Sequence, residues 1–193
     1  MVMRPAAKEV VGILLAAGRG TRYGGDKLLA SFNGECVGAA ACRHLIMVLP
    51  QVIAVVRPDD SALAAVLGAA GARIVRCANA DAGMGASLAC GVRATHDALG
   101  WVVALGDMPS IDPATIARVA SAVGHGAVVA APFHRGQRGH PVGFGAVCYE
   151  ALAALTGDEG AKPIVSSHID SITRIDVDDA GILSDIDRPS DIA

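Results

Sequence analysis

The sequence predicts an α/β protein, a three-layer α/β/α domain with a mostly parallel sheet, and three observations carry this prediction. Continuous apolar runs such as residues 10–16 and 101–105 end abruptly at glycine, which is typical of parallel strands buried on both faces. Segments of helical composition separate these runs, which indicates crossover connections. No proline-rich linker or repeat divides the 193 residues, so we expect one domain over residues 1–193.

Six apolar segments are expected to form the strands of this sheet. The first segment is ended by Gly18 and Gly20, the second by Pro58, and the fourth by Gly106. In chain order the expected strands cover residues 10–16, 52–56, 73–76, 101–105, 127–131 and 172–177. Parallel sheets bind ligands outside the carboxyl ends of their strands, so the loops after residues 16 and 105 are the expected site.

Helices are expected between these strands. In chain order they cover residues 39–47, 61–70 and 85–99, and a fourth starts at Asp112 and Pro113. Asp59, Asp60 or Ser61 can cap the second helix, and Gly71 can end it. The fourth begins with an aspartate N-cap followed by proline, which is favoured at the first helical position.

Composition and charge exclude several classes of protein. A net charge of −3 and a pI near 6.0 argue against a nucleic-acid partner, because such proteins carry a basic face. No apolar run is long enough for a membrane span and no signal-peptide pattern is present, so we expect a cytoplasmic protein with no membrane partner. Five cysteines without a C-x-x-C pair favour reduced thiols in the core, and scattered histidines argue against structural zinc.

The loop from residue 17 to residue 27 combines four glycines, two arginines and a lysine directly after a buried strand. Glycines let backbone N–H groups approach an anion, and the cationic side chains neutralise it, so the loop is suited to phosphates. The dinucleotide pattern G-x-G-x-x-G fails at Tyr23, and the Walker pattern is broken by Asp26 and by Leu28. A different class of phosphate loop is therefore expected.

A single carboxylate, Asp107, follows the apolar run 101–105 at the expected ligand edge. Magnesium prefers one or two protein carboxylates together with water and substrate phosphates, so one well-placed aspartate is sufficient. The alternative is an aspartate that only caps the turn before Pro109. Beside the phosphate loop, Asp107 is our candidate ligand of Mg2+.

The loop L-A-A-G-x-x-x-R-x-G-x-x-K, from Leu15 to Lys27, resembles the signature of the MobA-like nucleotidyltransferases, which include molybdenum cofactor cytidylyltransferases and guanylyltransferases. The resemblance implies a Rossmann-like, nucleotide-diphospho-sugar transferase-like fold. It implies that Lys27 and Arg22 contact the phosphates and, with Asp107, form the catalytic set. The nucleotide-binding residues it implies are Leu15, Ala16, Ala17, Gly18, Arg19, Gly20, Thr21, Lys27, Gly85 and Ser87.

Four further segments carry the same resemblance. L-G-D-M-P around Asp107 matches the magnesium motif, and D-I-D-R-P-S-D near the end resembles a tail whose middle aspartate lies near the metal, which makes Asp187 the candidate second ligand. G-H-P-V-G-F and G-D-E-G-A-K resemble acceptor-side segments, which implies that His140 and Lys162 bind the acceptor. Lys162 replaces the usual arginine and Gly143 a larger apolar residue, so the acceptor is less well defined than the reaction.

The implied function is transfer of CMP from CTP to the terminal phosphate of molybdopterin, with release of pyrophosphate. Leu-Ala-Ala-Gly accompanies cytidylyl transfer in the family, so Ala17 favours CTP over GTP. The acceptor phosphate is already ionised, so positioning and charge neutralisation should carry catalysis. A sugar phosphate acceptor, GTP as donor and a noncatalytic nucleotide-binding module remain as alternatives. A molybdoenzyme or chaperone is a possible transient partner.

Overall fold

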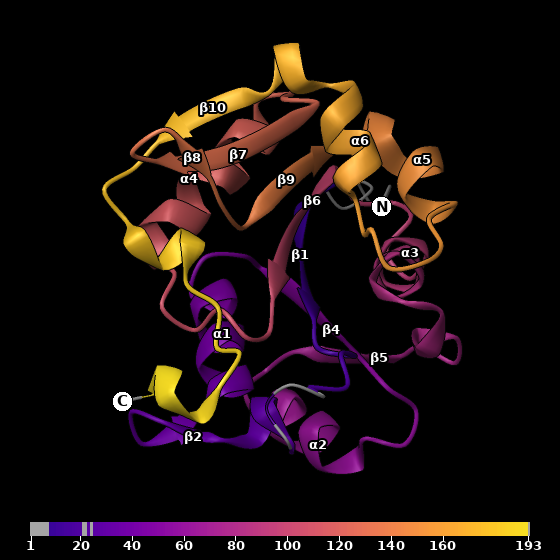
Figure 1. The fold of residues 1–193 in the computed structure, drawn as a ribbon. Coiled ribbons are helices and arrows are strands. Elements are labelled where there is room, and N and C mark those ends of the chain that lie inside the picture. The colour runs from indigo at the N-terminus through magenta and orange to yellow at the C-terminus, as the bar shows by residue number, and fades with distance from the viewer. Residues whose placement is uncertain (1–7, 21–22, 24, 193) are drawn as a thin grey trace, which may run out of the picture.

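The computed structural model describes residues 8–20, 23 and 25–192, and its main element is a mixed eight-stranded sheet (Figure 1). The strand order is β10-β7-β9-β6-β1-β4-β5, with β8 paired to β7. The strands of this sheet are β1 (Val10–Leu15), β4 (Gln51–Val56), β5 (Arg73–Arg76), β6 (Gly100–Leu105), β7 (Val129–His134), β8 (Gln137–Arg138), β9 (Val142–Gly145) and β10 (Thr173–Asp176). A separate hairpin pairs β2 (Ser31–Phe32) with β3 (Glu35–Cys36).

Helices cover both faces of the sheet. The α-helices are α1 (Val37–Ile46), α2 (Ser61–Ala69), α3 (Met84–Arg93), α4 (Pro113–Gly124), α5 (Tyr149–Ala153) and α6 (Lys162–Ser167). Six short 3-10 helices complete the described chain: η1 (Lys27–Leu29), η2 (Ala80–Ala82), η3 (Ala146–Cys148), η4 (Ile169–Ser171), η5 (Ala180–Leu183) and η6 (Pro189–Ile192). Figure 1 shows α1 and α4 on one side of the sheet and α3 and α5 on the other.

Two hydrophobic cores, one on each face, confirm the predicted three layers. One joins alternate strand residues such as Leu14 to side chains of α1, α2 and α4. The other joins the intervening residues, such as Ile13, to α3, α5 and α6. Because side chains of a strand alternate between faces, an unbroken apolar run is what a sheet covered on both sides requires.

The central strands and helix starts lie where the sequence predicts them. Asp60 caps α2 by accepting a hydrogen bond from the N–H of Leu63, and Asp112 caps α4 by accepting from the N–H of Ala114. All five cysteines are free thiols. Within the part of the chain that the structure describes, no helix is both long and apolar enough to cross a membrane.

Helix α3 and the strands β7 and β9 differ from the prediction, and α5, α6 and the β2–β3 hairpin were not predicted. Helix α3 ends at Arg93 rather than near residue 99, because Thr95 turns back to donate to the carbonyl of Gly91 while accepting from the Trp101 indole N–H. The strand expected at residues 127–131 is β7, shifted to Val129–His134. Strand β9, which was not predicted, runs antiparallel between β6 and β7.

Candidate active site

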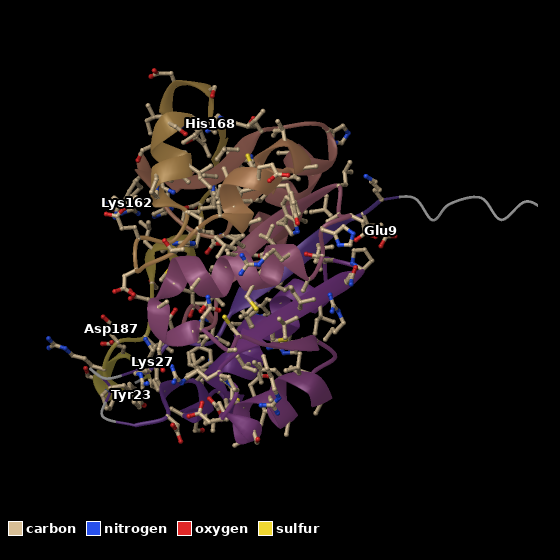
Figure 2. All side chains as sticks on the ribbon, turned by 90° about the vertical axis from the view of Figure 1, so that its right-hand side faces the viewer. Glu9, Tyr23, Lys27, Lys162, His168 and Asp187 are labelled. Atoms are coloured by element: carbon tan, nitrogen blue, oxygen red, sulfur yellow. The ribbon has the colours of Figure 1, made fainter. Side chains whose placement is uncertain are left out.

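The candidate site lies at the carboxyl edge of the parallel strands, where the sequence places it. A pocket of about 470 Å³ opens there, between the loops that follow β1, β4 and β6 and the start of α3. Its lining includes Leu15, Ala17, Lys27, Arg57, Asp81 and Asp107. Figure 2 shows Lys27, Tyr23 and Asp187 together at this edge, while Glu9, just before β1, lies at the opposite side.

Lys27 begins η1, at the point where the glycine-rich loop ends. Its N–H donates to the carbonyl of Gly25 at 2.8 Å, which fixes the turn that delivers the side chain into the pocket. The ammonium Nζ lies 2.7 Å from Oδ2 of Asp107 and 3.4 Å from Oδ1 of Asp187, and the side chain is only 12% exposed. Burial lowers the pKa of Lys27, but the two carboxylates outweigh it and the net shift is upward. The residue is therefore a permanent cation.

Three carboxylates meet beside this ammonium. Single ligand oxygens of Asp107, Asp185 and Asp187 all lie within 4.8 Å of one another. Oδ1 of Asp107 is buried and has no hydrogen-bond partner among the residues that the structure describes. A hard divalent cation prefers oxygen ligands of this kind, and a buried carboxylate oxygen without a partner fits such a cation.

Asp185 was not among the candidate ligands from the sequence, although it stands in the tail motif that supplied Asp187. The sequence signal for Asp185 was its spacing of two positions from Asp187, because residues i and i+2 of an extended chain point to the same side. The structure thus adds one carboxylate to the predicted pair.

An arginine pair forms a second charged cluster at the pocket. Arg57 donates to Oδ1 of Asp81 at 2.6 Å, and Arg19 donates to the same oxygen at 2.8 Å. Hydrogen bonds from Arg57 first, and then from Arg19, hold the pKa of Asp81 at about 2. Arg57 directly follows β4. Because ligands bind outside the carboxyl ends of parallel strands, this position could have identified Arg57 as a pocket residue from the sequence.

The start of α3 forms another wall of the pocket. Ser87 lines it and donates its hydroxyl to the carbonyl of Gly83 at 3.3 Å. Gly83 has a φ of +114°, and a Cβ there would collide with the side chain of Asp158, so this close approach requires glycine. Gly85 packs against the neighbouring backbone instead, because its N–H donates to the carbonyl of Gly157 at 2.8 Å.

The predicted nucleotide-binding residues therefore divide into three groups. Those that line the pocket are Leu15, Ala17, Gly18, Arg19, Gly20, Lys27 and Ser87. Ala16 and Gly85 are not part of the lining, and Ala16 is buried with its N–H bound to the carbonyl of Val55. Thr21 and the predicted catalytic residue Arg22 lie outside the described residues.

The two predicted acceptor residues do not line the pocket itself. The backbone N–H of His140 donates to the carbonyl of Ile182, and its buried Nδ1 has no partner among the described residues. Burial, helped by Arg138, lowers the pKa of His140 against the opposing effect of Asp107 and Asp185. Lys162 begins α6, and Figure 2 shows it on the same side of the molecule as Lys27.

Comparisons with known proteins agree with this geometry. The MobA-like NTP transferase domain matches residues 12–172. Purine catabolism protein PucB of Bacillus subtilis (strain 168) is 26% identical, with 94% of this chain and 93% of PucB covered. Nicotine blue oxidoreductase of Paenarthrobacter nicotinovorans is 30% identical, with 92% of each chain covered.

A solved structure shares the same sequence identity with this chain as nicotine blue oxidoreductase does. The crystal structure of Rv0371c from Mycobacterium tuberculosis H37Rv superposes with a TM-score of 0.82 at 30% identity, over 96% of each chain. A manganese complex of that protein superposes with a TM-score of 0.74 at 27% identity, over 89% of each chain. The strand order and layers are those of the nucleotide-diphospho-sugar transferase-like fold that the resemblance implied.

Proposed function

The chain belongs to the MobA-like NTP transferase family, and we propose that it transfers CMP from CTP to the terminal phosphate of molybdopterin and releases pyrophosphate. The family makes it a nucleotidyltransferase that binds a nucleoside triphosphate. The choice of CTP and the choice of acceptor are the proposal. Its support comes from the arrangement of the pocket and from the resemblance of individual segments.

One observation carries the proposed chemistry: a cation from the glycine-rich loop meets carboxylates from two distant segments at the point where Lys27 and Asp107 line the pocket. Lys27 is separated from Asp107 by 80 positions and from Asp187 by 160, and all three come together at the carboxyl edge of the sheet. A triphosphate needs cations around its oxygens, and a metal that accompanies it needs carboxylates. This pocket offers both.

The transfer needs little covalent help from the protein. An oxygen of the acceptor phosphate attacks the α-phosphorus of CTP, a new P–O bond forms, and the bond between the α-phosphorus and the leaving pyrophosphate breaks. A phosphate monoester is ionised at neutral pH, so no general base is required. Lys27 and the loop amides would hold the pyrophosphate, Arg19 and Arg57 add positive charge at the pocket, and Arg22 takes the same role by its match to the family motif.

The three aspartates would hold a divalent ion, which we propose is Mg2+. When bound, it supplies charge neutralisation around the phosphates. Asp107 brings a buried oxygen without a described partner, and Asp185 and Asp187 bring further oxygens within reach. The manganese complex of Rv0371c supports divalent metal use in a related structure.

Ala17 is the basis for proposing CTP. It is 6% exposed, lines the pocket and stands where Leu-Ala-Ala-Gly accompanies cytidylyl transfer in the family. Its methyl group reduces the space available to a base at this wall. GTP is the competing donor.

The acceptor assignment rests on the segments around His140 and Lys162. The backbone N–H of His140 donates to the carbonyl of Ile182, three positions before Asp185, so its segment lies beside the segment that carries Asp185 and Asp187. A phosphorylated acceptor at this segment would lie beside the metal site. The neutral imidazole would donate a hydrogen bond, and Lys162 would contribute a positive charge. A sugar phosphate is the competing acceptor, and a molybdoenzyme or chaperone could receive the product.

The oxidoreductase name of one relative suggests a different reaction for that protein. A dinucleotide fingerprint would need glycine at position 23, where this chain has Tyr23, so the loop does not favour a nicotinamide cofactor.

A matrix of donors and acceptors tests the proposal. Four radiolabelled nucleoside triphosphates are incubated with molybdopterin and with a panel of sugar phosphates, and labelled dinucleotide and pyrophosphate are scored. We expect product from CTP with molybdopterin. Turnover with a sugar phosphate alone would disprove the acceptor, turnover with GTP alone would disprove the donor, and tight nucleotide binding without turnover would favour the noncatalytic module.

A further inference from the structure

Lys27 is paired with two of the residues that the metal site would use. Its ammonium lies 2.7 Å from Oδ2 of Asp107 and 3.4 Å from Oδ1 of Asp187. Those two residues are also members of the carboxylate cluster that could hold a divalent ion. The same side chain is the one expected to hold the phosphates of the nucleotide, so Lys27 has two possible sets of anionic partners in one pocket.

A lysine ammonium and a divalent ion compete for the negative charge of the same carboxylates. Magnesium binds oxygen at about 2.0–2.1 Å and needs its ligands without another cation inside the shell. A carboxylate oxygen that receives a hydrogen bond from Nζ at 2.7 Å is directed at the ammonium, and the positive charge there repels a second cation. The low exposure of Lys27, 12% of its side chain, reduces screening of this repulsion by water.

The side chain can leave the cluster without unfolding the site. Lys27 is the first residue of η1, a helix of three residues, and its Nζ stands at the end of four flexible methylene groups. The pocket extends from the carboxylates to the glycine-rich loop, so a triphosphate bound along the loop would offer the ammonium a stronger anionic partner.

We propose that Lys27 is an exchangeable counter-ion of the carboxylate cluster, which it keeps closed to divalent metal until the triphosphate of a bound nucleotide draws the ammonium away. The metal ion and the nucleotide then bind with positive cooperativity, and by linkage each raises the affinity for the other by the same factor. This inference rests on the proposed function only in taking a nucleoside triphosphate as the ligand.

The other cations of the pocket supply a matched control. Arg57 also lines the pocket, but its guanidinium is bound to Asp81, at 2.6 Å, and not to the carboxylate cluster. Removing Arg57 therefore takes away one positive charge from the same pocket and leaves the carboxylates of Asp107 and Asp187 paired with Lys27. A second control, Lys27→Arg, keeps the charge at position 27.

The test measures binding of Mn2+ alone, by electron paramagnetic resonance of the free ion, with no nucleotide present. Lys27→Met, which keeps most of the length of the side chain but removes the charge, should bind Mn2+ at least about tenfold more tightly than the parent. Arg57→Met and Lys27→Arg should change the affinity by less than about threefold. Circular dichroism and thermal unfolding confirm that each variant is folded.

The second part of the test repeats the titration with a nonhydrolysable CTP analogue. In the parent the analogue should increase the affinity for Mn2+ by at least about tenfold, and in Lys27→Met this increase should fall to less than half. The proposal is overturned if Lys27→Met binds Mn2+ no more tightly than the parent, or if Arg57→Met gains as much affinity. These measurements need no acceptor and no turnover, so a failed transfer assay and a failed exchange of cations are distinguishable.

Discussion

The backbone N–H of Ile186 donates a hydrogen bond to the carbonyl of Asp107 at 2.9 Å. This contact fixes the C-terminal segment, residues 185–187, against the end of β6. Asp185 directly precedes the bonded residue in the sequence, and Asp187 directly follows it. A second backbone contact lies just before this segment, where the N–H of His140 donates to the carbonyl of Ile182 at 3.0 Å, and the close approach there leaves no room for a Cβ at Gly139. Backbone contacts thus help to hold the three carboxylates together against their mutual repulsion.

Asp185 should contribute to metal binding. Asp185→Asn keeps the size of the side chain but removes its charge, so we expect the affinity for Mn2+ in the presence of CTP to fall at least about tenfold. Asp178→Asn, on a fully exposed carboxylate of the same region, should leave the affinity unchanged. Calorimetric titration of both variants measures the difference, and equal affinities would remove Asp185 from the site.

Lys27→Ala and Asp107→Ala should each lower kcat/KM for pyrophosphate release by about 100-fold or more, because each removes charge stabilisation of the transition state. Both should remain folded. Asp107→Ala should also abolish the metal dependence of nucleotide binding. If Asp107→Ala binds CTP with the same metal dependence as the parent, the assignment of Asp107 is wrong.

Ala17→Gly should reduce the preference for CTP over GTP. Removing one methyl group from the wall of a binding pocket changes discrimination on the order of tenfold. Competition between the two nucleotides, measured as the ratio of their kcat/KM values, checks this. An unchanged ratio would mean that the preference is set elsewhere in the pocket.

His140 should make the protein less stable in mild acid. Its pKa is lowered from 6.5 in the folded state, so below pH 6.5 the unfolded chain binds more protons than the folded one, and stability falls as the pH falls. His140→Gln cannot be protonated and should lose less stability between pH 7.5 and pH 5.5. Urea unfolding at both pH values tests this, and equal losses would contradict it.

Much of the fold was predictable from short segments of the sequence. Apolar runs ended by glycine mark β1 and β6, and the capping residues Asp60 and Asp112 mark the starts of α2 and α4. Strand β9 has no such signal because half of its four residues are glycines. Gly143 is needed there for packing, since a Cβ would come within 2.5 Å of Val123 on α4.

The meeting of Lys27 and Asp107 was predictable because each residue stands in a motif of its own directly after a buried strand. Arg57 and Asp81 were not given a role, because their pairing joins the end of β4 to a 3-10 helix distant in the sequence. Which side chains of neighbouring loops meet depends on strand order, and no single segment encodes that order. The sequence correctly predicted which edge of the sheet carries the pocket, but it did not predict all of the contacts between the loops at that edge.

Nucleotidyl transfer in this pocket can be tested by following two positions of label in CTP. Parallel reactions with molybdopterin use CTP labelled at the α-phosphorus or at the γ-phosphorus, and the products are separated. We predict that the α label enters the dinucleotide and the γ label enters pyrophosphate, in equal amounts, and that both signals vanish in Asp107→Ala. Transfer of the γ label to the acceptor, or its release as inorganic phosphate without dinucleotide, would contradict nucleotidyl transfer.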